Sequence, residues 1–444
     1  MKKAGKVFDL YMYLIMIVFP LFMWRGFIDI KESKAVFFFA VSGLFFLLIA
    51  FLAGKEQVRA FYLWKEHKFY LLFLATGFLG LLFSGYPVSA FIGDYGRYNG
   101  LLTAIVYLLI GSMIISYGKF KEGFRYAFEI SGAVVCLLGV LNHYGIDPFH
   151  VYEHILKKVA KMYLSTFGHV NIYTSFLAIL LPVYAVSFYT AKKKWQMIVH
   201  MAGYCLACYT LLISGSDSGY LALLALFGVL GIRCLRTKTG RKRVLALLVA
   251  FAVVTAATGA VRALTYQSTG KKKKLDSISK AILTLDFERV SAYFEYNDDW
   301  GNGRGFIWNR GLSYYMELPF YKKVIGIGPD MLLPAMIDYC GEESKEKFDV
   351  YYDNMHNEVF QYLITYGALG LLFLILWCGK MAWKIHKRAG ENSMCLMVFT
   401  MMMCYGVQSL VNIGTISVKG ILIVWIFMAG TEIEDNRVDR RKSI

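Results

Sequence analysis

A short polar segment, Asp353-Asn-Met-His-Asn-Glu358, precedes a long apolar stretch and contains the residue best suited to acid–base chemistry. Histidine can act as a base near neutral pH, and His356 lies where the chain would enter a membrane. Asn357 and Glu358 follow it and are candidates to orient its ring. The same pattern also suits a helix N-cap at Asn354 or Asn357, so the motif alone leaves both catalysis and capping open.

Two arginines, Arg304 and Arg310, lie six positions apart upstream of this histidine. That spacing directs them to different faces of a helix. At a membrane surface, guanidinium groups suit a phosphate or diphosphate, because their planar N–H groups match its oxygens. The alternative is a salt bridge with a local acid such as Asp298 or Glu317.

A third arginine, Arg97, lies in the glycine-rich segment Gly93-Asp-Tyr-Gly-Arg-Tyr-Asn-Gly100, which opens another apolar stretch. The glycines allow the backbone to come close to a partner, and N–H groups at a helix start favour an anion. The alternative is an arginine that reaches from the membrane edge into water.

Two further polar segments, 165–171 and 214–219, also precede apolar stretches, and each alone is typical of a helix cap. Neither the histidines nor the eight cysteines have metal-ligand or disulfide-framework spacing. Cys205 and Cys208 have the spacing of a redox motif, but they lie inside an apolar stretch, where small packing residues are expected. We therefore predict no metal site and no cofactor.

Long apolar segments must position these residues. Of 444 residues, 57% are apolar and 18% are charged, against roughly a quarter charged in soluble domains. A helix needs about 20 apolar residues to cross a membrane. We predict an all-α polytopic membrane protein whose roughly twelve spans fall at 8–24, 35–53, 69–84, 100–117, 126–143, 172–190, 195–213, 215–233, 243–262, 358–379, 394–411 and 413–430.

Lysine and arginine counts in the loops give the orientation. With the N-terminus inside, short inner segments hold 27 of the 48 basic residues, as the positive-inside rule requires. Both termini are then cytoplasmic, and the net charge of +17 faces anionic lipid rather than nucleic acid. We expect spans one to nine within 1–262, a large extracytoplasmic loop at 263–357, and three spans with a cytoplasmic tail within 358–444.

The large loop is too rich in aromatic residues to be a disordered linker. We expect it to be partly helical, with helices at 275–285, 303–317 and near 330–338, and a turn at 325–329. The second long outer segment, 144–171, contains an amphipathic stretch from His150 to Tyr163. That stretch suits a helix in the membrane interface or one that covers the rim of the bundle.

Taken in order, these segments resemble the O-antigen ligase and polymerase superfamily over roughly residues 80–380. The family's "TFGNPN" type of motif corresponds to Thr166–Asn171, and its "TGSRG" hairpin corresponds to Ser214–Gly219. An arginine–tryptophan helix and a "P..G.G" turn correspond to Arg304–Arg310 and Pro319–Gly328. The family's "HNEYLQ" motif corresponds to His356–Gln361.

Three departures accompany this resemblance. His169 and Val170 replace the usual Asn-Pro, and Val359 and Phe360 replace Tyr-Leu. The hairpin has Asp217-Ser218 where many relatives have an arginine that binds the donor.

The resemblance implies a C-type membrane glycosyltransferase in the cytoplasmic membrane, with an extracytoplasmic site and a metal-independent, inverting reaction. A glycan would pass from a polyprenyl diphosphate donor to the hydroxyl of a glycan or glycolipid acceptor. His356 would be the base, and the substrate would also contact Asn357, Glu358, His169 and Asn171. Because the hairpin arginine is missing, we expect Arg310 and Arg97 to share the diphosphate, with Arg304 as the alternative second cation.

Three other functions remain open, one of them a structural scaffold, whose outer loop would need no pairing of histidine with arginine. A polymerase of lipid-linked repeat units for capsule or wall polysaccharide has the same motifs. A flippase or transporter would belong to another class, but such proteins usually place charges in the middle of the membrane and often contain inverted repeats. Spans 172–190 and 394–411 contain no charged residue, and the chain has no evident repeat.

Overall fold

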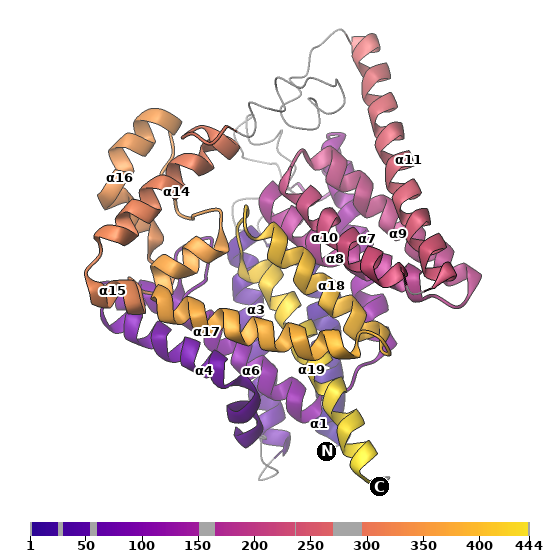
Figure 1. The fold of residues 1–444 in the computed structure, drawn as a ribbon, viewed down its shortest axis with the longest axis horizontal. Coiled ribbons are helices and arrows are strands. Elements are labelled where there is room, and N and C mark those ends of the chain that lie inside the picture. The colour runs from indigo at the N-terminus through magenta and orange to yellow at the C-terminus, as the bar shows by residue number, and fades with distance from the viewer. Residues whose placement is uncertain are drawn as a thin grey trace.

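The structure, a computed structural model, describes residues 2–24, 30–53, 60–150, 165–235, 237–269 and 295–442. The regular structure of these residues is helical (Figure 1). In chain order the helices are α1 (Lys2–Tyr13), η1 (Leu14–Val18), α2 (Phe19–Leu21), α3 (Ile30–Ala53), α4 (Ala60–Leu82), α5 (Pro87–Ile92), α6 (Leu101–Tyr117), α7 (Glu122–His143), α8 (Val170–Thr190), α9 (Lys194–Ser214), α10 (Ser218–Cys234), α11 (Lys238–Thr269), α14 (Trp300–Glu317), α15 (Phe320–Ile325), α16 (Leu332–Phe348), α17 (Glu358–Arg388), α18 (Ser393–Gln408) and α19 (Ile416–Lys442).

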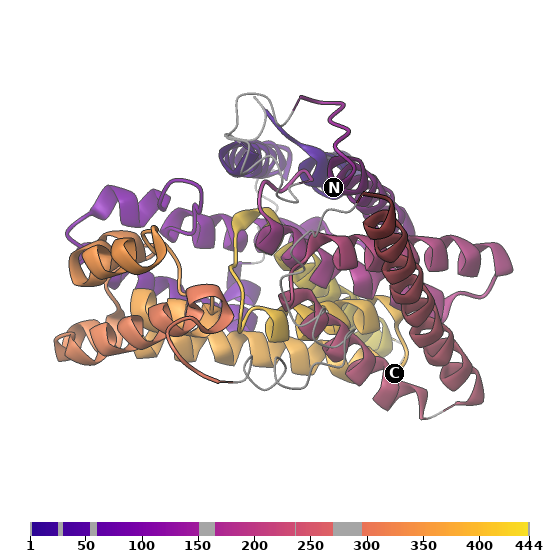
Figure 2. The ribbon, with the colours of Figure 1, turned by 90° about the horizontal axis from the view of Figure 1, so that it is seen from above.

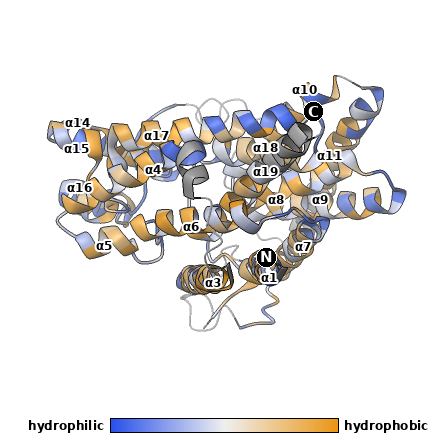
Figure 3. Ribbon diagram, turned by 90° about the horizontal axis from the view of Figure 1, so that it is seen from below, coloured by the Kyte–Doolittle hydropathy of each residue, from blue (hydrophilic) through white to orange (hydrophobic). Residues whose placement is uncertain are grey.

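The fold is that of an all-α polytopic membrane protein, as predicted. Among the described residues, seven helices are long and apolar enough to cross a membrane, and four shorter apolar helices accompany them. Each of the twelve predicted spans overlaps a helix, and apolar residues dominate these helices (Figure 3). The sequence pattern underestimated several lengths, since α11 continues to Thr269 and α17 to Arg388.

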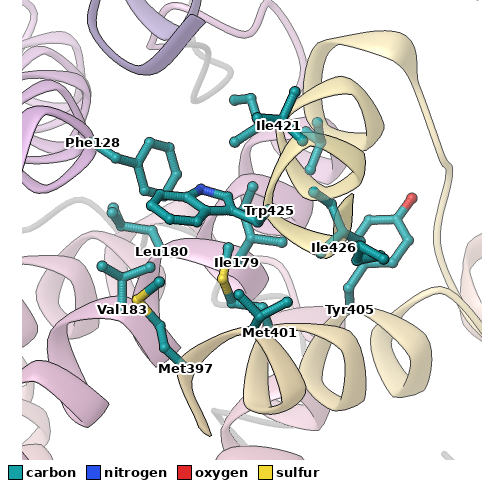
Figure 4. Close-up of a cluster of buried hydrophobic side chains, with 14 of the residues drawn as sticks. Phe128, Ile179, Leu180, Val183, Met397, Met401, Tyr405, Ile421, Trp425 and Ile426 are labelled. Carbon is teal, nitrogen blue, oxygen red and sulfur yellow. The ribbon is translucent and has the colours of Figure 1, made fainter. Parts of the chain in front are cut away.

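The main core surrounds α8, which is buried over almost its whole length. A helix that is apolar all round fits such a central position. Trp425 of α19 lies fully buried there, beside Phe128 of α7 and Leu180 of α8 (Figure 4). Met397 and Met401 of α18 close the other side of this cluster.

A second, smaller core joins α14 and α16 to α5, beside the end of α4 and the start of α17 (Figures 1 and 2). Phe306 and Ile307 of α14 pack there with Leu332 and Met336 of α16, and Ala90 of α5 is buried among them. Of the helices predicted in this region, 303–317 corresponds to α14 and 330–338 to the longer α16. The predicted helix at 275–285 and most of the amphipathic stretch His150–Tyr163 lie outside the described residues.

The turn after α15 is inserted between α4 and α17. The backbone N–H groups of Ile327 and Gly328 donate to the carbonyls of Ile364 and Thr365, at 3.1 Å each. Helix α17 breaks immediately afterwards at Gly367, whose φ is 69°. A Cβ on Gly326 or Gly367 would overlap backbone atoms across this contact, so the close approach requires glycine at both positions.

Candidate active site

His356 lies in the connection that leads into α17, and its backbone is held from two sides. Its φ is 49°, and its backbone N–H donates to the side chain of Asn354 at 2.7 Å. The preceding residue, Met355, is fully buried, and its carbonyl accepts from the Trp308 indole of α14 at 2.7 Å. The position of the imidazole is therefore set jointly by α17 and α14.

The imidazole of His356 is neutral at physiological pH. Burial lowers its pKa to about 3, and the charges of Arg304 and Arg97 contribute to the lowering. Its Nδ1 is buried and has no hydrogen-bond partner among the described residues. A neutral ring with an unused nitrogen is the form that can accept a proton.

Asn357 and Glu358 hold the start of α17. Asn357 is the N-cap, and its Oδ1 accepts from the backbone N–H groups of Val359 and Phe360 at 2.9 and 3.2 Å. Glu358 accepts a hydrogen bond from Tyr405 and lies 3.5 Å from the Lys419 ammonium, both on other spans. These two residues fix the start of the helix that follows His356. Asn357 bonds to the backbone of α17, and Glu358 bonds to side chains of other helices.

Arg97 lies at the tip of a closed loop and is buried, with 6% of its surface exposed. The ends of this loop, Gly93 and Gly100, touch so closely that a Cβ on Gly100 would overlap the Gly93 backbone. The guanidinium forms a bidentate pair with Asp353, and its Nε donates to Oδ2 at 2.9 Å. Burial alone would raise the pKa of Asp353, but Arg97 holds that pKa below its usual range.

A buried carboxylate from the large loop shapes the Arg97 loop. Oδ2 of Asp330 accepts from the backbone N–H groups of Asp94 and Asn99, at 2.8 and 3.0 Å. Burial raises the pKa of Asp330 to about 7 against the opposing effect of these two donors. This residue was not predicted from the sequence, although it directly follows the predicted turn at 325–329.

The two arginines of α14 point in different directions, as their spacing predicts. Arg304 is close enough to His356 and His169 to interact electrostatically with both. Arg310 instead forms a bidentate pair with Glu343 of α16, at 2.7 and 2.6 Å. The structure therefore brings Arg304 to the His356 cluster and places Arg310 on the side of α14 that faces α16.

His169 and Asn171 start α8 beside the same cluster. His169 is the N-cap, and its Nδ1 accepts from the backbone N–H of Asn171 at 3.1 Å. Burial lowers its pKa to about 4, and Lys31 and Arg97 add to the effect. Because Nδ1 is an acceptor, the proton of this neutral ring lies on Nε2, which can donate to an anion but cannot act as a base.

Lys31, at the start of α3, is a further cation of this cluster that was not predicted from the sequence. The Lys31 ammonium lies beside Gly96, the residue before Arg97. Its Nζ would be 3.9 Å from a Cβ at that glycine. Lys31 also interacts electrostatically with Arg97 and Asp353. The only feature of the sequence that could have indicated this role is the position of Lys31 in the outer segment before the predicted span 35–53.

The hairpin between α9 and α10 meets the start of α8 in a buried polar network. Ser216 and Ser218 lie 3.3 and 3.2 Å from the Thr174 hydroxyl. Asn412 donates to the carbonyl of Asn171 at 2.9 Å and to Ser218 at 3.2 Å. This network joins the two polar segments that the sequence showed separately, and it connects α8 and α10 to the segment between α18 and α19.

The assembled cluster combines the cations Lys31, Arg97 and Arg304 with the neutral imidazoles of His169 and His356. Such a set can bind a multiply charged anion and accept a proton beside it. Among the described residues, no group of three His, Cys, Asp or Glu side chains has the arrangement of a metal site. The charged and imidazole side chains of this cluster can supply charge stabilisation and base catalysis.

Comparison with known proteins is consistent with this geometry. Residues 202–375 match the family described as O-antigen ligase. The matched segment includes the hairpin, both arginines of α14 and His356, whereas Lys31, Arg97, His169 and Asn171 precede it. A search of curated proteins found no match.

Proposed function

Because its central segment is of the O-antigen ligase type, we propose that the chain transfers a glycan from a polyprenyl diphosphate donor to an acceptor hydroxyl. The observation that carries this proposal is the clustering of the neutral His356 imidazole with Arg97 and Arg304. Attack by a hydroxyl requires a base, and departure of a diphosphate requires cationic groups that stabilise its charge. The acceptor is a second glycan or a glycolipid.

In the proposed reaction, His356 accepts the proton of the acceptor hydroxyl. The hydroxyl oxygen forms a bond to the anomeric carbon while the bond from that carbon to the diphosphate oxygen breaks. The configuration at the anomeric carbon inverts in this single displacement, and the polyprenyl diphosphate leaves with the electron pair of the broken bond. The positive charge on His356 and the negative charge on the leaving group arise together, so each stabilises the other.

Arg97 and Arg304 are the proposed ligands of the diphosphate, with Lys31 and the Nε2–H of His169 beside them. Arginine suits this role because its planar N–H groups meet two oxygens at once. Arg97 already holds a carboxylate, Asp353, in the bidentate manner that a phosphate would use. Arg310 is less suited than the sequence suggested, because it pairs with Glu343 on the side of α14 that faces α16, whereas Arg97 and Arg304 are the arginines that act on His356.

The site lies at the end of the bundle for which the lysine and arginine counts predict the extracytoplasmic side. A lipid-linked donor presents its diphosphate at the membrane surface, where the starts of α6, α8 and α17 meet. The positive ends of these helices add to the attraction for an anion. The protein would thus act in the cytoplasmic membrane and on its outer face.

The test is a transfer assay with the purified chain in nanodiscs and a defined polyprenyl diphosphate glycan. His356→Ala should lower turnover on the order of 10²–10⁴-fold, with donor binding retained. His386→Ala is a matched control, because this histidine lies in the last turn of α17, at the other end of that helix. Wild-type turnover by His356→Ala would refute the assignment of the base. Incubation with donor alone separates the two enzyme classes, since a polymerase gives a ladder and a ligase gives no product.

A further inference from the structure

The short helix α15 exposes large apolar side chains although it belongs to the segment between two spans. Phe320 has 82% of its surface exposed, and Tyr321 beside it is also exposed. Met316, near the end of α14, is exposed in the same region. A contiguous group of this kind on a water-facing loop would be unusual, and it marks a contact surface.

This group continues the exposed apolar stripe of α4. Phe78, Leu79 and Leu82 are exposed on one side of that helix, and Phe83, directly after its last residue, is exposed as well. The ring of Phe83 meets the ring of Tyr321 edge to face, with centroids 5.9 Å apart. The exposed apolar surface of the predicted span 69–84 therefore reaches α15 through the contact of Phe83 with Tyr321.

The backbone around α15 is built for a membrane environment. The bonds from Ile327 and Gly328 to the carbonyls of Ile364 and Thr365 fix the following turn against α17, inside the second turn of that helix. The Ile325 carbonyl lies against Gly80 of α4, 3.0 Å from where a Cβ would be. Irregular backbone at membrane depth is tolerated where protein groups satisfy it, as here.

The two lysines of α15 directly follow its exposed aromatic residues. Its last turn carries Lys322 and Lys323, both half-buried, directly after the exposed aromatic pair. Lysine side chains at this level extend to lipid phosphates while their stems stay in apolar surroundings. Aromatic residues followed by lysines are typical of a segment at the membrane interface.

We propose that α15 is seated in the membrane, with Phe320 and Tyr321 among phospholipid acyl chains and Lys322 and Lys323 at the level of the phosphates. The segment between α11 and α17 is then partly immersed at α15. If the proposed function holds, this seating sets Asp330, and through it Arg97, at the depth where a lipid-linked diphosphate lies. The lipid contact itself does not depend on that function.

The experiment uses the full chain in phospholipid nanodiscs with the photoreactive residue benzoylphenylalanine, whose ketone inserts into nearby C–H bonds. It is placed at Phe320, and in separate samples at Leu82 of α4 and at Val350. Leu82 sets the yield for a lipid-facing side chain, and Val350 is a partly exposed position of the same loop away from α15. After irradiation, mass spectrometry measures the fraction of protein that carries one phospholipid.

The expected result is a lipid adduct at Phe320 with a yield close to that at Leu82, and no adduct above background at Val350. A yield at Phe320 equal to that at Val350 would overturn the proposal. The photoreactive residue placed at Tyr321 must give the same result as at Phe320. Transfer activity is measured separately, so loss of the proposed function leaves this result intact.

Discussion

The carboxylate of Asp330 accepts the backbone N–H of Asn99 at 3.0 Å, across 231 positions of the chain. With its bond to Asp94, this contact closes the loop whose tip is Arg97. We predict that Asp330→Ala lowers kcat/KM for the donor on the order of 10²-fold, because a small displacement of Arg97 is enough to cost that much. Asp330→Asn should retain most activity, since its amide oxygen can accept the same two bonds.

A double-mutant cycle tests whether Asp330 acts through Arg97. In an Arg97→Ala background, Asp330→Ala should have little further effect, because the residue that it positions is already gone. Additive losses would show that Asp330 has another role. If Arg97→Ala left kcat/KM for the donor unchanged, the assignment of Arg97 to the donor site would be wrong, regardless of the effect of Asp330→Ala.

The second prediction concerns the three arginines. Arg97→Lys and Arg304→Lys should each lower kcat/KM for the donor roughly 10²–10³-fold, as when one charge-stabilising donor is lost. Lysine keeps the charge but cannot present the planar pair of N–H groups. Arg310→Lys should be mild, because Arg310 is paired with Glu343 away from His356. The reverse order, with Arg310→Lys inactive and Arg304→Lys normal, would show that Arg310, and not Arg304, binds the diphosphate.

A third prediction follows from the pKa values of His356 and Asp330. The pKa of His356 is about 3, so the base stays neutral as the pH falls from 8 to 5. Asp330, with a pKa of about 7, gains a proton in that interval. Asp330→Asn resembles the protonated carboxyl, whose oxygen can still accept from Asp94 and Asn99, so this protonation should change kcat/KM little and the pH profile should stay nearly flat between pH 8 and 5. A limb near pH 6.5 that persists in Asp330→Asn would mean that His356 titrates like an exposed histidine.

A fourth prediction concerns the buried ion pair of Glu358 and Lys419, whose side chains are 14% and 13% exposed. Glu358→Gln should lower stability by about 3–5 kcal/mol, because it leaves the Lys419 ammonium without a carboxylate partner among the spans, beside only the neutral Tyr362. The double variant Glu358→Gln/Lys419→Met should recover most of the loss. Thermal unfolding in detergent measures both. Equal melting temperatures for Glu358→Gln and the parent chain would remove this role from Glu358.

The fifth prediction is the sidedness of the protein. Tyr351→Cys should react with an impermeant thiol reagent in intact cells, whereas Lys242→Cys should react only after the membrane is opened. Both positions are exposed and lie outside the predicted spans. Labelling in the opposite order would move the site to the cytoplasmic face and exclude a flipped donor.

The spans could be predicted because a membrane imposes one requirement, a run of apolar residues of fixed length. The sequence also predicted that Arg304 and Arg310 occupy different faces of one helix. It could not predict which face meets His356, because that depends on the packing of α14 between α16 and the Met355 connection. Glu343, the partner of Arg310, carries no local signal for this pairing.

Asp330 and Lys31 were missed for a related reason. Each makes its decisive contact with the Gly93–Gly100 loop, far away in sequence, and neither lies in a motif that suggests chemistry by itself. The role of Glu358 was also hidden, because its partners Tyr405 and Lys419 come from two later spans. Local patterns locate helix starts, but contacts between helix starts are a property of the assembled bundle.

The ion pair between Arg97 and Asp353 limits which fragments of the chain could retain the proposed site. It joins a residue of the N-terminal quarter of the chain to one that lies within the region of family similarity, 202–375. That region by itself contains the proposed base and Arg304 but neither Arg97, Lys31 nor His169. The proposed active centre is therefore bipartite, and a fragment restricted to 202–375 would lack the residues that complete the proposed anion site.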